Sequence, residues 1–595
     1  MIFFDFEYNE HQVLLCVAQK GANWFSFDFR NGRQTQEFAD WVRSNKMEVF
    51  ASYAVAAEIE SMLRLGLQVD NLKFVDLMAE CKMITMSHDA YFTADASMLG
   101  QVRAILKKDI TEDAAHKEKM RELILSKNEW NGEEWDEIEL YCYSDIIPLK
   151  DLWEKIKVIH QQGAHPYSIQ HAIHRGEYIR KATEMDFASR GFPVYGGDVE
   201  KIYGNRERIK DAIILNLPYY WKACYEKNKD GKWTLRRRLI TQLIDSRGWV
   251  WKKTDNGGPC LEADYLDELR VSIPEVTSLY TAVRSLTTLN SADLREQIRE
   301  GYIKTKTFAF SAKTGRNGLK PKHGFLLNLP SWMRKIVHPH PGMALIGVDW
   351  SQQEIAIAAA LSSDEKLLDA YNSGDMYLTL GKVSGSIPQD GTKQTHAVER
   401  QLFKGLQLGL GYGKGQKSLG AEFYSILKDK GVSETDARIR AKEAYNWHKS
   451  YFSQYWAWIK KQLGSARMNG WISTSDNWIC WVSRRTLDTQ LLNFPSQSGG
   501  AVMMRIATGY FYDLWKAGYI EPLLCSQHDG FYFNIPEEKV AEQLPLIKEV
   551  MKQASIACIG TEVRVDAKIF TNENSYVPDH FEARHEQLWN LAIGE

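Results

Sequence analysis

The stretch from Ala344 to Gly413 constrains this chain most, because it combines a strand pattern, two helix patterns and charged side chains at fixed offsets. It opens on the run Ala344–Val348, which is short, apolar and partly β-branched and so predicts a buried strand. This strand would deliver Asp349 to an edge of a sheet. A carboxylate at the end of a strand can hold a metal ion.

A helix is expected to begin directly after this strand. Ser351-x-x-Glu354 has the pattern of a capping box, in which two side chains satisfy backbone N–H groups at the start of a helix. Apolar residues follow at helical spacing, namely Ile355, Ala358, Ala359 and Leu361. The strand is therefore predicted to turn straight into a helix near Asp349. Taken alone, Ser351 and Glu354 could be nothing more than a helix cap without a functional role.

A second helix pattern carries positive charge. Arg400, Lys404, Leu408 and Tyr412 fall four apart, which on a helix lines them along one slowly drifting face. Two cations one turn apart make a cradle for phosphates. The same segment contains the glycines Gly405, Gly409, Gly411, Gly413 and Gly415. Each would cost a helix interior about 1 kcal/mol relative to alanine, so a glycine-rich loop stays an alternative.

A second carboxylate follows much later in the chain. Two apolar runs flank Gln527, His528, Asp529 and Gly530, a pattern that predicts a strand, a tight turn and another strand. Asp529 would then lie at the tip of a hairpin, beside the strand that ends at Asp349. Two such carboxylates can bridge a pair of Mg²⁺ ions about 3.5–4 Å apart. Taken alone, the segment is equally compatible with a simple hairpin turn.

In this order, the three segments resemble motifs A, B and C of family A DNA polymerases. Motif A corresponds to Asp349–Glu354, motif B to Arg400–Gly413 and motif C to Gln527–Asp529. The resemblance implies an α/β multidomain protein with a right-hand polymerase domain of palm, fingers and thumb. It also implies template-directed, DNA-dependent DNA polymerase activity, in which Asp349 and Asp529 are the catalytic pair that holds two Mg²⁺ ions, with Mn²⁺ able to substitute.

The resemblance assigns the nucleotide pocket to Gln352, Glu354, Arg400, Lys404, Leu408 and Tyr412. Glu354 matches the steric gate that crowds a ribose 2′-hydroxyl, and Tyr412 closes the pocket. The two cations of motif B contact the triphosphate. Two positions depart from the family: Leu408 stands where Phe or Tyr is usual, and Gly530 stands where Glu usually follows the motif C aspartate. Because both aspartates are present, activity is expected to survive these departures.

Residues that contact DNA are implied by further likenesses. The segment Lys304–Pro330 contains six Lys or Arg, which suits contacts to the DNA backbone, although composition alone makes it a basic loop of unknown purpose. Within it, Arg316 matches an arginine that reads the minor groove, and Asn328 lies in a segment near the primer and template. Gln497 matches a minor-groove glutamine, and His528 matches a contact to the primer end.

The first 32 residues alternate strand and turn, a pattern that predicts an antiparallel meander. Asp5 and Glu7 are two apart on its first strand and share one face, whereas Phe4 and Phe6 take the other. Two carboxylates on one face repel each other unless a cation is present. The alternative is an exposed edge strand with acidic gatekeepers.

Further side chains complete a second resemblance. Glu58 lies on a helix after a predicted strand, and Tyr141 and Asp145 lie one turn apart on a later helix. With Asp5 and Glu7 they resemble the 3′–5′ proofreading exonuclease joined to family A polymerases, which has a ribonuclease H-like fold. This implies that the four carboxylates hold two metal ions and that Tyr141 orients the attacking water. In its second motif the family commonly has an Asn and an Asp. This chain has Glu58 there and lacks the preceding Asn. A degenerate exonuclease domain that is kept as a scaffold is therefore the alternative.

At 595 residues the chain is too long for a single core. The expected domains are the exonuclease at 1–160, a connector with the start of the palm at 161–200, the thumb and primer-contacting segment at 201–335, the palm with motif A at 336–385, the fingers with motif B at 386–480 and the palm with motif C at 481–595, closing in an irregular end. The Trp and Tyr residues of 414–470 have helical spacing and are expected in the core rather than stacked on template bases.

Composition limits the remaining choices. The formal net charge is only −2, so local patches rather than a global basic field would bring the chain to nucleic acid. The eight cysteines include no close pair at zinc-ligand spacing and are expected to be reduced core residues. The chain has no apolar run long enough for a membrane and no signal peptide pattern, so a cytoplasmic location is expected. That the cell is a phage-infected host is implied only by the resemblance to phage enzymes.

The compact N-terminus, without room for a separate 5′ nuclease, resembles phage replicative enzymes. Some of these copy genomes in which 2-aminoadenine replaces adenine, and the overall look of the chain suggests that branch. The expected partners are primer-template DNA and dNTPs, the chain acting as a monomer with helicase and processivity partners unknown. The alternative function is a 3′–5′ exonuclease or a DNA-binding scaffold with an inactive polymerase site.

Overall fold

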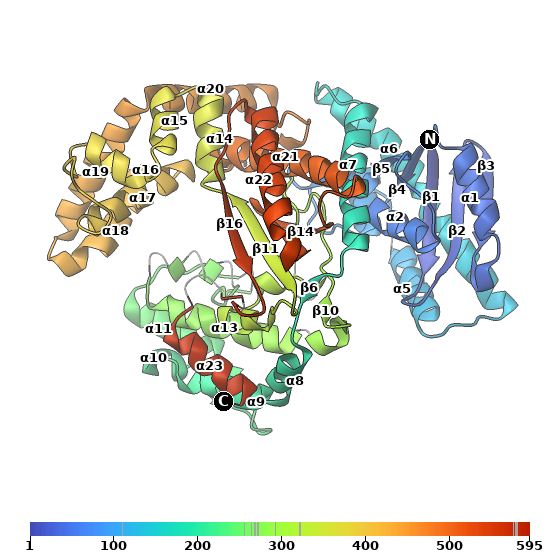
Figure 1. Cartoon of the computed structure of the whole chain (residues 1–595), viewed down its shortest axis with the longest axis horizontal. Coiled ribbons are helices and arrows are strands. Elements are labelled where there is room, and N and C mark those ends of the chain that lie inside the picture. The colour runs from blue at the N-terminus through green and yellow to red at the C-terminus, as the bar shows by residue number, and fades with distance from the viewer. Residues whose placement is uncertain are drawn as a thin grey trace.

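The computed structural model describes residues 1–109, 111–254, 256–262, 265–266, 269–270, 273–291, 293–319, 323–574, 576–577 and 581–594. A central four-stranded sheet stands between three other parts of the molecule (Figure 1). We call residues 1–188 the N-terminal module, residues 192–336 with 583–593 the lower lobe, and residues 365–469 the upper lobe. Figure 1 shows the upper lobe and the N-terminal module on opposite sides of the central sheet, with the lower lobe beneath.

The N-terminal module is a five-stranded sheet covered by helices. Its strands are β1 (Ile2–Tyr8), β2 (Val13–Lys20), β3 (Asn23–Asp28), β4 (Val49–Ser52) and β5 (Lys73–Asp76), in the order β3-β2-β1-β4-β5. Its helices are α1 (Thr35–Ser44), α2 (Val55–Arg64), α3 (Leu77–Thr85), α4 (Met98–Gln101), α5 (Thr111–Leu125), α6 (Gly132–Gln162) and α7 (Ile169–Ala188). The predicted meander β1-β2-β3 is confirmed. Because β1 also pairs in parallel with β4, the alternative of an exposed edge strand is wrong.

The central sheet has the order β14-β15-β11-β16. Its strands are β11 (Met343–Trp350), β14 (Leu523–Gln527), β15 (Gly530–Pro536) and β16 (Val565–Phe570), all paired antiparallel. The helices α14 (Gln353–Ser362), α21 (Asp488–Lys516) and α22 (Val540–Ile559) pack with it. In this register Asp349 lies opposite Gly530 on one side and Asp566 on the other.

Two helical lobes flank the central sheet (Figure 1). The upper lobe contains α15 (Glu365–Asn372), α16 (Met376–Val383), α17 (Ala397–Gly411), α18 (Gln416–Leu427), α19 (Glu434–Tyr451) and α20 (Ser453–Asn469). The lower lobe contains α8 (Gly196–Gly204), α9 (Arg206–Leu215), α10 (Tyr219–Lys222), α11 (Arg237–Arg247), α13 (Val276–Ser291) and the short strands β6 (Phe192–Pro193), β7 (Tyr225–Lys227), β8 (Trp233–Leu235), β9 (Ile298–Arg299) and β10 (Tyr302–Ile303). It also includes the last helix, α23 (Ala583–Ile593), where an irregular end was expected.

Buried apolar side chains of the described residues group into separate cores, one for each part. The core of the N-terminal module also takes in Trp478 and Trp481. These two residues belong to a hairpin of β12 (Trp471–Ser473) and β13 (Ile479–Trp481), which follows the upper lobe in sequence. By its packing the hairpin therefore belongs to the N-terminal module.

One local prediction, at the start of the helix after motif A, is contradicted by the structure. The capping box at Ser351 is wrong, because α14 begins after Gln352, whose φ is 53° and whose side chain caps nothing. Ser351 instead bonds to Asp566 of β16, and its N–H donates to the carbonyl of Arg564 at 2.8 Å. Long-range strand pairing therefore overrides the local cap.

The helix expected for motif B is present, and the glycine-rich loop alternative is wrong. Helix α17 runs through Gly405 and Gly409. A Cβ placed at Gly405 would lie 2.6 Å from Glu422 Oε1 of α18, and one at Gly409 would lie 2.9 Å from Lys414 Cδ. These glycines therefore allow close packing between α17 and the chain that follows it.

The described residues settle two expectations from composition. All eight cysteines are free, and all but Cys558 are buried. Within the described ranges, no helix has the length and apolar character that crossing a membrane requires.

Of the six cations expected to contact DNA between Lys304 and Pro330, Lys320 and Lys322 lie outside the described residues.

Candidate active sites

The two aspartates of the predicted polymerase site lie close together, one near the end of a strand and the other in the turn before its partner strand. Asp349 is the penultimate residue of β11, and Asp529 is the last residue of the turn before β15. The backbone N–H of Trp350 donates to the carbonyl of Asp529 at 3.0 Å, which fixes the turn against the strand. Both aspartates line a cavity of about 190 Å³. The predicted strand, turn and strand around Asp529 are confirmed.

Gly530 allows this close approach. A Cβ at Gly530 would lie 2.7 Å from the carbonyl oxygen of Val348 and 3.2 Å from the Cβ of Asp349. A side chain at this position would therefore push β15 away from β11. Gly530, which stands where the family usually has Glu, thus lies at a tight contact between β11 and β15.

This contact leads to a testable expectation. The Gly530→Ala substitution should slow primer extension about tenfold and lower the free energy of unfolding by about 1–3 kcal/mol, because the added methyl overpacks the strand pair and shifts Asp529. Extension kinetics and thermal unfolding would measure the two effects. Gly464→Ala is the matched control, since a Cβ at Gly464 in α20 meets no atom within 4 Å. Unchanged extension by Gly530→Ala would contradict the expectation.

A second cavity, of about 310 Å³, lies between the central sheet and the upper lobe. Predicted site residues that line it are Arg316, Gln352, Glu354, Leu408, Tyr412, His528 and Asp529. Asp529 lines both cavities and so connects them. Burial raises the pKa of Asp529, while the charge of Arg316 acts in the opposite direction. A carboxylate in this setting is suited to pairing with a cation.

Polar contacts cross this second cavity. Arg316 Nη2 donates to Glu354 Oε1 at 2.7 Å, and Arg316 Nε donates to the carbonyl oxygen of Gln497 at 3.3 Å. Burial, and then the charge of Glu354 and a hydrogen bond to it, raise the pKa of Tyr412 to about 12. The arginine expected to read the minor groove is thus bonded to the residue expected to act as the steric gate.

Other predicted residues lie outside this cavity. Arg400 and Lys404 are on α17, about two turns and one turn before Leu408, and they do not line this cavity. Arg400 Nε donates to Asp375 Oδ2 at 2.7 Å, while Lys404 is exposed. The side-chain amide of Asn328 donates to the carbonyl of Leu319 at 3.5 Å, and Asn328 lines neither of the two cavities.

Sequence reasoning missed some residues that line the second cavity. Tyr455 is among the aromatic residues expected to be core, and it is only 4% exposed, yet it also lines the cavity. Gln407 lines it too and bonds to His448 at 3.0 Å. Tyr377, on α16, was not singled out at all. A helical stripe of aromatic residues does not reveal which member also faces a cavity.

The acidic residues of the N-terminal module converge. Asp5 and Glu7 share one face of β1, and their carboxylates lie within 4.8 Å of each other and of the thiol of Cys142. Glu58, at the start of α2, accepts a hydrogen bond from the N–H of Phe6 at 3.0 Å. Asp145 lies on α6, which packs against β1. Strand and helix thus bring together residues that are far apart in the sequence.

Burial, and then repulsion between neighbouring carboxylates, both raise pKa values in this acidic cluster. Burial and then the charge of Asp145 raise the pKa of Asp5 to about 8. Burial, followed by the neighbouring carboxylates, also raises the pKa of Glu7 and of Glu58. A cluster of buried carboxylates with raised pKa values is stabilised by bound cations. Carboxylate oxygens are the ligands that Mg²⁺ prefers, so the donor set fits divalent ions.

Lys117 is a member of this cluster that the sequence did not single out. Its Nζ lies 2.5 Å from Asp145 Oδ2 and 5.6 Å from the ring centroid of Tyr141. Tyr141 also forms a hydrogen bond with Asp145, and burial together with that contact raises the pKa of Tyr141. Lys117 lies in α5 among many other charged residues, so no local pattern distinguishes it.

Comparisons with curated proteins give consistent matches. DNA polymerase I of Aquifex aeolicus is 28% identical over 467 residues, covering 75% of this chain and 77% of that protein. The thermostable DNA polymerase I of Thermus thermophilus is 25% identical over 475 residues, covering 76% of this chain but 51% of that protein. For DNA polymerase I of Chloroflexus aurantiacus the identity is 26%, and the chain spans 33% of its length.

A solved structure and a family profile complete the comparison. The POL domain of Pol1 from M. smegmatis, in complex with DNA primer-template and dNTP, matches with a TM-score of 0.67 at 16% identity. The match covers 96% of this chain and 95% of that one, so the polymerase fold extends over nearly all of the chain. Residues 228–575, more than half of the chain, match DNA polymerase family A. The chain therefore belongs to DNA polymerase family A, whose members are DNA-directed DNA polymerases.

Proposed function

We propose that this polymerase extends a primer on a DNA template by two-metal nucleotidyl transfer from dNTPs. The observation that carries the proposal is that Asp349 of β11 and Asp529, in the turn before its partner strand β15, line one cavity, while Asp529 also lines the cavity that contains Glu354 and Tyr412. The structural neighbour, which is a complex with DNA primer-template and dNTP, supports these substrates.

The aspartates fit divalent ions by the chemistry of their donors. Asp349 and Asp529 would hold two Mg²⁺ ions, or Mn²⁺ in their place. Ions bound there would activate the primer 3′-hydroxyl and neutralise the leaving pyrophosphate. The chain itself contributes positive charge from Arg400 and Lys404 on α17. Because Arg400 is paired with Asp375, it has to exchange this partner for the triphosphate.

Glu354 is proposed to exclude ribonucleotides. Its carboxylate is held by Arg316 and Tyr412, so it presents a fixed wall to the sugar. Glu354→Ala should raise ribonucleotide incorporation relative to deoxyribonucleotide incorporation about tenfold, because the wall is removed. The ratio of kcat/KM for CTP and dCTP measures this change. Glu354→Gln keeps the volume and should retain most of the discrimination, and an unchanged ratio in Glu354→Ala would rule out the gate.

We also propose that the N-terminal module removes nucleotides from a primer 3′ end. The convergence of Asp5, Glu7, Glu58 and Asp145 supports this proposal, since four carboxylates in a buried cluster fit two divalent ions. Ions bound there would activate a water molecule for attack on the terminal phosphodiester. Tyr141, bonded to Asp145, would orient that water.

A gel assay with a labelled primer, template and Mg²⁺ tests these proposals together. Extension with dNTPs supports the polymerase, and shortening without dNTPs supports the exonuclease. Shortening alone would indicate an exonuclease with an inactive polymerase site. A mobility shift without either reaction would indicate a DNA-binding scaffold.

A role in phage genome replication, with 2-aminoadenine in place of adenine, stays a prediction from the resemblance. A side-by-side assay of dATP and 2-aminoadenine deoxynucleoside triphosphate opposite template T would test it. The assay should be run with the intact chain and with the Asp5→Ala variant, so that selection during synthesis is separated from removal afterwards. Equal use of the two nucleotides in both variants would contradict a specialised base preference.

A further inference from the structure

The turn of the β12–β13 hairpin contacts both the N-terminal module and the segment that precedes Arg316. Its residues 474–478 follow the upper lobe in sequence, but the hairpin packs into the core of the N-terminal module. The N–H of Trp481 donates to Ser87 Oγ at 2.9 Å, which attaches the hairpin to that module. The turn also contacts the segment that carries Arg316. The turn is thus in contact with the N-terminal module and with the segment before Arg316.

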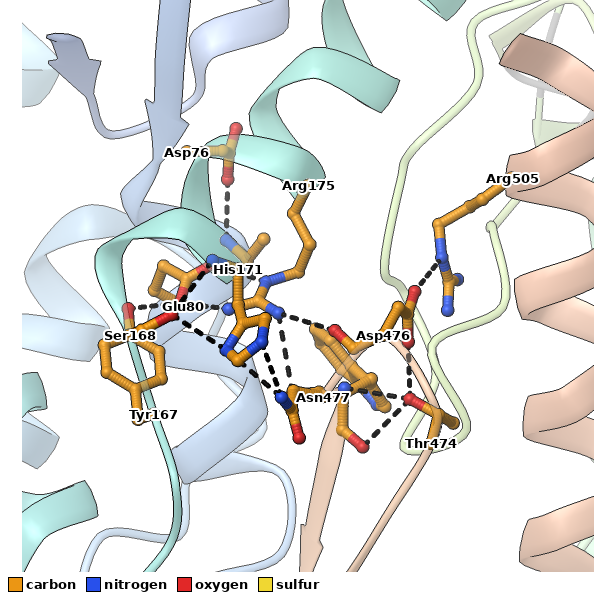
Figure 2. A network of polar contacts seen from close by, with 12 residues as sticks. Asp76, Glu80, Tyr167, Ser168, His171, Arg175, Thr474, Asp476, Asn477 and Arg505 are labelled. Atoms are coloured by element: carbon orange, nitrogen blue, oxygen red, sulfur yellow. Dashed lines mark hydrogen bonds and ion pairs between the residues drawn. The ribbon is translucent and has the colours of Figure 1, made fainter. Parts of the chain in front are cut away.

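On the side of the N-terminal module, a buried ion pair holds the turn. Arg175 of α7 donates to both carboxylate oxygens of Glu80, at 2.7 and 2.8 Å, and these side chains are 2% and 0% exposed. Arg175 Nη1 also donates to the carbonyl oxygens of Asp476 and Asn477, at 3.4 and 3.5 Å. Figure 2 shows Arg175 between Glu80 and the backbone of this turn. Arg175 therefore connects α3 to the hairpin.

On the polymerase side, the carboxylate of Asp476 is the connecting group. Its Oδ2 accepts from Arg505 Nε at 2.7 Å, and its Oδ1 accepts from Thr474 Oγ1 at 2.5 Å (Figure 2). Although burial acts to raise it, the charge and hydrogen bond of Arg505 hold the pKa of Asp476 below its ordinary value. Arg505, on α21, in turn donates from Nη1 to the carbonyl oxygen of Gly315 at 3.0 Å.

A second contact fixes the same segment. Trp478 is 1% exposed, and its Nε1 donates to the carbonyl oxygen of Lys313 at 2.8 Å. Its ring stacks on Phe310, with centroids 4.8 Å apart. Gly315 has a φ of 73°, and a Cβ there would lie 3.1 Å from the Trp478 ring. The hairpin therefore holds the backbone at Lys313, and its Trp478 ring lies against Gly315, directly before Arg316.

From these contacts we infer that Asp476 is a positioning residue for the polymerase reaction. Through Arg505 and Gly315 it sets the position of Arg316, and Arg316 holds the carboxylate of Glu354 in the nucleotide cavity. Asp476 itself does not line that cavity. The inference rests on the proposed role of Glu354 in sugar selection. Because Arg175 holds the same turn, the N-terminal module is part of this positioning.

The test is the Asp476→Asn variant, which keeps the shape of the side chain and removes its charge. Arg505 then loses the charge of its partner, so that Gly315 is held less firmly and Arg316 loosens its hold on Glu354. We expect the KM for dNTP to rise about fivefold, kcat to stay within about twofold, and the preference for dCTP over CTP to fall about fivefold. A merely structural role would lower the folded fraction and kcat but leave KM and sugar preference unchanged.

A double-mutant cycle separates this inference from the proposed function. In a Glu354→Ala background, Asp476→Asn should no longer alter sugar preference, because its effect passes through Glu354. If Glu354→Ala alone leaves sugar preference unchanged, the proposed gate fails. If Glu354→Ala changes it and Asp476→Asn does not, or the two changes add, the inference about Asp476 is overturned.

Two further variants complete the design. Asp513→Asn is the matched control, because Asp513 is an exposed carboxylate on the same helix as Arg505 and pairs with Lys181 of α7 at 3.4 Å. It should leave KM and sugar preference unchanged. If Asp476→Asn does not fold, Thr474→Val removes the hydroxyl that bonds to Asp476 and to the backbone of Trp478 in the same turn, and it should shift KM and sugar preference in the same direction. Unchanged values in Thr474→Val would then overturn the inference.

Discussion

Asp529→Ala is expected to abolish primer extension while leaving DNA binding intact. Of the two proposed ligands only Asp349 on β11 would remain, and one carboxylate supplies too few ligands to hold two divalent ions in place. We expect the extension rate to fall about a thousandfold or more, which corresponds to about 4 kcal/mol of lost transition-state stabilisation. Affinity for primer-template DNA should be unchanged or slightly higher, because one negative charge near the DNA phosphates is removed.

Single-turnover extension and fluorescence anisotropy with a labelled primer-template would measure the two quantities separately. Asp369→Ala provides a control, because Asp369 is an exposed carboxylate on α15 and does not line either polymerase cavity. It should extend primers at the normal rate. Near-normal extension by Asp529→Ala would refute the assignment of the polymerase site.

Asp5→Ala should remove 3′–5′ degradation and leave DNA synthesis unchanged. Asp5 stands at the centre of the acidic cluster, within reach of Glu7 and electrostatically coupled to Asp145. Removing it takes away a ligand that both proposed ions would need, so degradation should fall about a thousandfold. Synthesis should be unaffected, because Asp5 belongs to the core of the N-terminal module and the polymerase aspartates belong to the central sheet.

Shortening of a labelled primer without dNTPs measures degradation, and extension with dNTPs measures synthesis in the same preparation. Asp136→Ala is the matched control, since Asp136 is an exposed carboxylate on α6, the helix that carries Asp145. Persistent degradation by Asp5→Ala would mean that another site performs the cleavage. Loss of synthesis in the same variant would mean that the two activities are not separable at this residue.

Features that depend on neighbouring residues could be predicted from the sequence. The strand that ends near Asp349, the hairpin around Asp529 and the meander that carries Asp5 and Glu7 follow from apolar periodicity and turn residues. Their convergence was expected from the resemblance to a family rather than from spacing. For that reason most of each candidate site was foreseen.

Features that depend on partners far away in the chain could not be predicted. Ser351 has the local pattern of a cap, but it bonds to Asp566, 215 residues later. Lys117 carries no signal in its own helix, and its role is visible only where α5 meets Asp145, 28 residues later. In the same way, the pairing of Arg400 with Asp375 depends on how α16 and α17 pack.

The hairpin β12–β13 limits how this enzyme can be re-engineered. Trp481 is only 6% exposed, and its ring lies against His88 and His160 of the N-terminal module, with ring centroids 5.0 and 5.7 Å apart. Deleting that module to obtain a variant without nuclease activity would expose this indole ring to water and remove Arg175 from the turn that it holds, which favours aggregation. To remove nuclease activity, substitution of single residues is therefore safer than truncation, because the polymerase part needs the N-terminal module to cover the hairpin.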